Sequence, residues 1–146
     1  MARRFREPWG EDYPHREVTE AVIAAALRVQ SALGPGLEAE VYRICLAHSL
    51  QLDGRQVLRD VSQDLVFEGM LLAGVYTLDL VVDGKVVTLV RTVGRLDDVD
   101  FEQLNSRLRL SGYEVGLLLN FRAWPLKQGG IRRMIHTRPK PAEGGC

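Results

Sequence analysis

Apolar side chains recur every three or four positions over residues 17–33, a spacing that places them on one face of an α-helix. This helix is expected to end at Gly34-Pro35, because glycine tolerates the left-handed conformation at a helix end and proline does not continue a helix. A second helix is predicted over residues 37–50 and closes at Asp53-Gly54. The side chains expected to face inward from this second helix are Leu37, Val41, Ile44, Cys45 and His48.

The next part of the chain changes to patterns that are typical of β-strands. Residues 56–67 alternate between apolar and polar positions and are followed by a turn at Glu68-Gly69. Residues 75–82 and 85–93 are two nearly continuous apolar runs joined by Asp83-Gly84, a dipeptide that favours the tight turn of a β-hairpin. Such runs indicate strands that are covered on both faces of a sheet.

A helix between two further strands completes the predicted pattern. The helix spans residues 99–110, with Asp97 or Asp98 as its N-terminal cap. Buried strands are expected over residues 115–121 and 131–136. Because a strand–helix–strand unit follows a hairpin, the sequence predicts an α/β fold with a mixed sheet and helices on both faces.

The composition suits one compact domain, because 46% of the 146 residues are hydrophobic. No apolar run approaches the ~18 residues of a membrane span and the N-terminus lacks the apolar stretch of a signal peptide, so we expect no membrane contact and a cytoplasmic location. Cys45 and Cys146 form no disulfide framework or metal motif. Residues 17–121 carry nine bases and fifteen acids, unlike the basic surface of a general nucleic-acid binder.

Several local strings resemble one known family. They are LGPGLEAEVY (residues 33–42), GVYTLDLVVDGKVV (residues 74–87), FEQL, GYEVGLLLNF (residues 112–121) and GGIRRMIH. In this order they resemble the GxxExxY proteins of the PD-(D/E)XK nuclease-like superfamily. The resemblance covers residues 17–137 and implies a restriction-endonuclease-like core, a mixed β-sheet flanked by helices and preceded by an N-terminal helical pair. Residues 1–16 are then an irregular N-terminal arm, and residues 138–146 a flexible C-terminal tail.

The resemblance also implies a metal site, of which little is left. In active members of the superfamily, a strand acid and the Glu of a Glu-x-Lys on the next strand hold a divalent cation, usually magnesium, and an upstream helical acid often joins them. The lysine helps to orient or activate the attacking water. By this resemblance Asp79 matches the strand acid, whereas Leu89 and Arg91 stand at the Glu and Lys positions. Ala39 replaces the helical acid, and Gln103 matches a glutamine common on the following helix. We therefore expect no catalytic residue, no metal and no cofactor.

The remaining carboxylate needs a partner, because burying an unpaired charge is costly. Strand parity places Asp79 and Arg91 on the same side of the hairpin, so a charge-assisted pair is predicted, with Leu89 packed beside it. The alternative is a small polar cavity in which Tyr42 and Gln103 join this pair to accept a nucleotide, phosphate or other anion.

Three functions remain open, of which we favour the first. It is a catalytically inactive binding or scaffold protein that forms homo-oligomers, or contacts another protein, through the aromatic residues Phe5, Trp9, Tyr13 and Trp124. The second is a nucleic-acid-binding protein whose basic C-terminal region, with Arg132 and Arg133, contacts phosphates. The third is a residual magnesium-dependent nuclease that uses Glu38 or Glu40.

Overall fold

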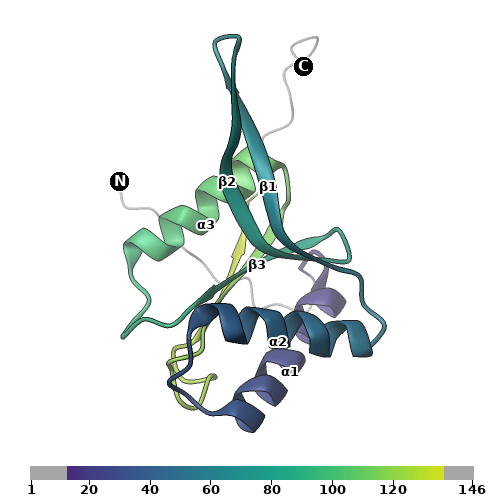
Figure 1. Cartoon of the computed structure of the whole chain (residues 1–146), viewed down its shortest axis with the longest axis vertical. Helices are drawn as coiled ribbons and strands as arrows, with labels where there is room; N and C mark the ends of the chain where they lie inside the picture. Colours follow the sequence, from purple (N-terminus) through teal and green to yellow (C-terminus); the bar gives the residue numbers. More distant parts are fainter. Residues whose placement is uncertain (1–12, 137–146) are drawn as a thin grey trace.

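The computed structural model describes residues 13–136, and its elements follow the order predicted from the sequence. They are α1 (Arg16–Leu33), α2 (Ala39–Leu52), β1 (Val57–Phe67), β2 (Met70–Val82), β3 (Val86–Arg91), α3 (Asp98–Ser111), β4 (Val115–Asn120) and β5 (Ile131–Ile135). The strands form one sheet in the order β1-β2-β3-β4-β5 (Figure 1). β3 and β4 are parallel, and all other neighbours are antiparallel. The predicted mixed α/β sheet is confirmed.

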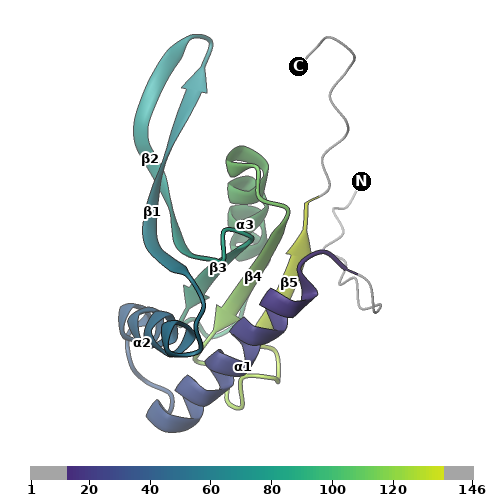
Figure 2. The same cartoon turned by 90° about the vertical axis from the view of Figure 1, so that its right-hand side faces the viewer.

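Helices cover both faces of the sheet, as the apolar runs predict (Figure 2). α1 and α2 share one buried cluster with the sheet, whereas α3 shares a second cluster with the opposite face. Leu117 and Leu118 are neighbours in β4, and both are fully buried, one in each cluster. The alternation of side chains along a strand therefore leads to burial on both sides.

The predicted inward face of α2 is wrong. Most of the side chains assigned to it are exposed, namely Leu37, Val41, Ile44 and His48, and Cys45 is half-buried. The buried side chains are Tyr42, Leu46, Ala47 and Leu50. Apolar residues surround much of this helix, so periodicity alone does not select a face. The ring of Tyr42 stacks on that of Phe121 with 4.6 Å between centroids, and this contact helps to set the buried face.

β1 and β2 form a long hairpin whose distal half projects away from the rest of the protein (Figures 1 and 2). The turn lies at Glu68-Gly69 as predicted, but β2 begins at Met70, earlier than the sequence indicates. The glycine at position 74 weakens the strand pattern, yet its N–H donates to Asp64 Oδ1 at 2.8 Å beside a shift in register. This irregularity allows the strand to continue through Gly74.

A buried glutamine on α1 holds the loop between β4 and β5. Gln30 Nε2 donates to the carbonyl oxygens of Phe121 at 3.1 Å and Ala123 at 2.6 Å, and Gln30 Oε1 accepts the N–H of Leu126 at 2.8 Å. Gln30 is only 3% exposed. Because buried backbone groups need partners, this side chain fixes the loop that carries Trp124.

Replacing Gln30 with leucine tests this anchor, because the change removes all three hydrogen bonds. We expect the free energy of unfolding to fall by about 2–4 kcal/mol, since two carbonyls and one N–H lose their partner. Chemical denaturation measures the loss. Gln51→Leu, on the exposed side of α2, is the matched control and should change stability by less than about 0.5 kcal/mol. Equal losses in both variants would contradict the anchoring role.

Candidate functional site

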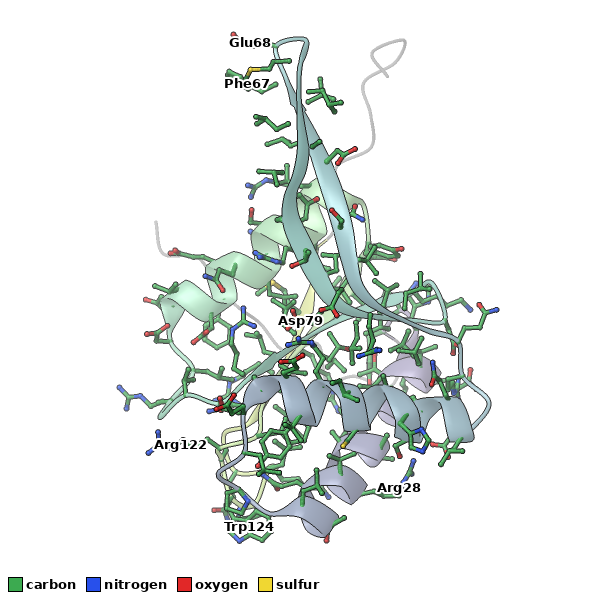
Figure 3. The ribbon with its side chains drawn as sticks, in the orientation of Figure 1. Arg28, Phe67, Glu68, Asp79, Arg122 and Trp124 are labelled. Carbon is green, nitrogen blue, oxygen red and sulfur yellow. The ribbon has the colours of Figure 1, made fainter. Side chains whose placement is uncertain are left out.

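Asp79 on β2 and Arg91 on β3 lie on the same side of the hairpin, as strand parity predicts (Figure 3 labels Asp79). Asp79 Oδ2 accepts the N–H of Val90 at 2.9 Å and lies 3.5 Å from Arg91 Nη1. The exposed fractions of the two side chains are 17% for Asp79 and 21% for Arg91. The predicted contact between them is confirmed.

Arg91 also contacts two side chains of α3, and its shortest hydrogen bond to a side chain is made to this helix. Arg91 Nη2 donates to Gln103 Oε1 at 2.7 Å, and Arg91 Nε lies 3.4 Å from Asp100 Oδ1. Sequence reasoning included Gln103 but missed Asp100, although the three-residue spacing places both on one face of the helix. We call Asp79, Arg91, Asp100 and Gln103 the Arg91 cluster. It joins β2, β3 and α3 through two carboxylates, an amide and one guanidinium.

The start of α3 fixes Asp100 in this cluster. Asp97, one of the two predicted caps, accepts the backbone N–H groups of Val99 at 3.1 Å and Asp100 at 3.4 Å. In return, Asp100 Oδ2 accepts the N–H of Asp97 at 3.0 Å. This reciprocal capping box leaves the other carboxylate oxygen, Oδ1, facing Arg91.

A second guanidinium, that of Arg107 on α3, adds positive charge near the cluster. Arg107 Nε donates to the carbonyl oxygen of Thr77 at 2.9 Å, and its guanidinium lies 5.7 Å from the centre of the Tyr76 ring. Burial lowers the pKa of Arg107, and the like charge of Arg91 lowers it further. Burial raises the pKa of the Tyr76 hydroxyl, against the opposing effect of Arg107. Two arginines thus balance the two carboxylates of the cluster in formal charge.

The other positions of the family pattern carry no oxygen ligand. Leu89 is fully buried in the apolar core between the sheet and α3. Ala39 packs against the apolar core on the opposite face, between the sheet and the helices α1 and α2. Tyr42 is fully buried on that second side, where its hydroxyl donates to the carbonyl oxygen of Gly34. The structure therefore does not bring Tyr42 into the Arg91 cluster, and the predicted cavity containing both is wrong in this respect.

The remaining predicted residues lie elsewhere. Arg132 and Arg133 are adjacent on β5, the edge strand opposite β1, so their side chains point to opposite faces of the sheet. Arg132 Nη1 donates to the preceding carbonyl oxygen at 3.0 Å, and the Arg133 guanidinium lies 5.7 Å from the centre of the Tyr13 ring. Tyr13, a predicted interface residue, thus contacts its own chain. Phe5 and Trp9 lie outside the described residues.

A cavity of about 790 Å³ opens beside the first turn of α2. Residues 35–39 line it together with Thr92, Arg122 and Trp124, and we call it the Trp124 cavity. Thr92 follows Arg91 in the chain, but no member of the Arg91 cluster lines the cavity. Its volume lies within the range typical of ligand and interface pockets. Sequence reasoning singled out Trp124 but did not predict the cavity.

A family model described as the PD-(D/E)XK nuclease superfamily matches residues 16–134. The match runs from the start of α1 into β5 and includes both the Arg91 cluster and the Trp124 cavity. No curated protein and no solved structure matches the chain. Within residues 13–136, no helix has the length and apolarity needed to cross a membrane.

The divalent metal ion that this superfamily implies does not fit the residues present. Magnesium requires a near-octahedral set of oxygen ligands. The side-chain oxygen donors at the site, from Asp79, Asp100 and Gln103, already contact Arg91, whose guanidinium keeps its charge, and Leu89 offers no oxygen. Among residues 13–136, no group of three His, Cys, Asp or Glu side chains is arranged to hold a metal ion. A metal ion would have to displace Arg91 first.

Replacing Arg91 with leucine tests whether this residue holds the site together. We expect the free energy of unfolding to fall by about 1–3 kcal/mol, because two carboxylates lose their cation. Adding Asp79→Asn should recover part of the loss, since the amide no longer carries an unpaired charge. Arg95→Leu, in the exposed loop after β3, is the control and should change stability by less than about 0.5 kcal/mol. Denaturation curves in which the two arginine variants agree would refute the role of Arg91.

Proposed function

We propose that this chain, which belongs to the PD-(D/E)XK nuclease superfamily, is a catalytically inactive member that acts as a binding or scaffold module. The observation that carries the proposal is the position of Arg91, whose side chain contacts Asp79, Asp100 and Gln103. Metal-dependent cleavage of a phosphodiester needs a cation that stabilises charge on the phosphate and activates water. A guanidinium activates no water, because it stays protonated at neutral pH and cannot act as a base.

Loss of cleavage leaves binding as the function of the fold, and we propose self-assembly as its form. Support comes from Trp124, which is 56% exposed at the cavity named after it, since exposed tryptophans are frequent anchors of protein interfaces. We also expect the N-terminal arm, with Phe5 and Trp9, to take part. Those residues lie outside the described range, so their role stays a prediction, as does membership of the GxxExxY family within the superfamily.

A nucleic-acid-binding role is the second candidate. The observation that favours it is the adjacent pair Arg132 and Arg133 on an edge strand of the sheet, part of a C-terminal sequence that is rich in bases. Phosphate contacts by such residues supply most of the affinity of non-specific binding. The acidic balance of residues 17–121 opposes this role, because it repels a polyanion from the rest of the domain.

Magnesium titration followed by NMR tests the loss of the metal site. In the natural sequence we expect no saturable shifts centred on Asp79 at millimolar magnesium, because the Arg91 guanidinium lies against Asp79 Oδ2 and adds positive charge at the site. In the double variant Leu89→Glu/Arg91→Lys we expect saturable shifts, because a second carboxylate then stands beside Asp79 and the guanidinium is removed. Adding Asp79→Ala to the double variant is the control and should abolish them.

Two results would contradict the loss of the metal site. Saturable shifts at Asp79 in the natural sequence, or DNA cleavage with manganese that Asp79→Ala removes, would overturn the proposal. Either outcome would support the residual nuclease that recruits Glu38 or Glu40.

A salt titration of DNA binding separates the second candidate from the first. Under the scaffold proposal, labelled DNA should show no shift at physiological salt, and Arg132→Ser/Arg133→Ser should behave like the natural sequence. Under the nucleic-acid candidate, the logarithm of the affinity should fall linearly with the logarithm of salt, and each lost phosphate contact should reduce the slope by about 0.9. A slope that the double variant reduces would therefore favour nucleic-acid binding.

A further inference from the structure

The distal end of the β1–β2 hairpin carries a group of large apolar side chains. We call this group the arm tip, and its members are Leu65, Val66, Phe67, Met70, Leu71 and Leu72. Val66, Phe67, Met70 and Leu71 have exposed fractions between 53% and 64%. Large apolar side chains that gather at one exposed end of a protein indicate a candidate site of interaction.

The register of the hairpin distributes the arm tip over two faces. One face carries Leu65 opposite Leu72 and Phe67 opposite Met70, and the other carries Val66 opposite Leu71. A ribbon with apolar side chains on both faces cannot bury them by lying flat on one surface, and a two-stranded hairpin on its own is marginally stable in water. The arm tip therefore fits a hollow surface that surrounds it.

The charges around the arm tip select a protein as its partner. Glu68 stands at the turn and Asp64 lies just behind it, whereas β1 and β2 contain a single base, Arg59, near the opposite end of the hairpin. Nucleic acids and anionic membranes both require clustered bases. An acidic apolar tip instead fits a protein cavity that is apolar and carries a base.

The outer edge of β1 is protected near the base of the hairpin. Asp60 adopts a left-handed conformation with φ of 52° within the strand, and its Oδ1 lies 3.5 Å from Arg43 Nε of α2. Backbone irregularities and charges of this kind keep an edge strand from pairing with another chain. The side chains of the arm tip remain as the surface for contact.

The Trp124 cavity has the complementary chemistry. Pro35, Leu37, Ala39 and Trp124 give it apolar walls, and Arg122 supplies a base. Arg122 is exposed, and the part of the chain that the structure describes provides no side-chain partner for its guanidinium. Glu38 is the acid of the lining and limits the attraction to Glu68. A volume of about 790 Å³ leaves room for several apolar side chains.

The arm tip and the cavity lie at opposite ends of the molecule. Phe67 and Glu68 stand at one end of the long axis, and Trp124 stands at the other with Arg122 close to it (Figure 3). An arm tip therefore cannot reach the cavity of its own chain, but a second copy presents the same cavity to it.

We propose that the arm tip of one copy inserts into the Trp124 cavity of a second copy, with Glu68 beside Arg122, so that copies associate head to tail. The contact joins two different surfaces, so each copy keeps a free tip and a free cavity, and the assembly grows into a ring or a filament. This inference rests on the proposed scaffold function and names the contact through which assembly occurs.

Two blocked variants of the full chain test the proposal. Phe67→Asp blocks the arm tip and leaves the cavity intact, and Leu37→Asp/Arg122→Glu blocks the cavity and leaves the arm tip intact. All three positions are exposed, so the fold should survive, as unfolding midpoints will verify. Leu52→Asp places the same charge on an exposed leucine away from both surfaces and is the matched control. Light scattering and analytical ultracentrifugation report the sizes of the species.

We expect the natural sequence and the Leu52→Asp control to assemble, and each blocked variant alone to lose association by about 30-fold or more, the effect of losing an interface anchor. Mixing the two blocked variants should produce a discrete pair, because one intact tip meets one intact cavity and growth stops there. Glu68→Arg should weaken assembly, and adding Arg122→Glu to it should restore assembly.

Other outcomes overturn the proposal in distinguishable ways. A dimer formed by the cavity-blocked variant alone would show that tips pair with tips. Assembly that both blocked variants retain, and that deletion of residues 1–12 abolishes, would assign the contact to the N-terminal arm and leave the scaffold proposal standing. A monomeric natural sequence at submillimolar concentration would overturn both this inference and self-assembly.

Discussion

The guanidinium of Arg91 is the group on which the Arg91 cluster depends. It contacts one carboxylate from β2 and another from α3, and it donates to Gln103 on the same helix. Bringing two carboxylates together without a cation is costly, because like charges repel and lose hydration on burial. In an active nuclease of this superfamily, a metal ion supplies the positive charge between the carboxylates. In this chain the Arg91 guanidinium supplies the positive charge, and it contacts one oxygen each of Asp79, Asp100 and Gln103.

The fold separates this site from the surfaces that remain available for contact. Apolar side chains are buried on both faces of the sheet, and the two exposed surfaces proposed for contact lie at the two ends of the molecule. One end is the projecting hairpin with its apolar arm tip, and the other is the Trp124 cavity, positioned by the hydrogen bonds of Gln30. Under the proposed head-to-tail contact these two ends are complementary, and such a contact allows repeated association.

The sequence predicted the features whose signals are local. Strand parity placed Asp79 beside Arg91, Asp-Gly marked the β2–β3 turn, and an aspartate marked the start of α3. Features that depend on packing were missed or wrong. α2 is apolar around most of its surface, so its packing against α1, the sheet and Phe121 decides which face is buried. In the sequence Asp100 is one of several acids at the start of a helix, and nothing local distinguishes it. Its contact with Arg91 forms only because α3 packs on the sheet.

The state of the Arg91 guanidinium in solution tests the central claim most directly. Its nitrogen-bound protons can be followed by ¹⁵N-resolved NMR, which distinguishes a held guanidinium from one that rotates freely. We predict slow rotation and slow proton exchange at Arg91, unchanged when magnesium is added to millimolar concentration. If magnesium instead releases the Arg91 group into fast rotation, the metal displaces it, and the account of an inactivated site is contradicted.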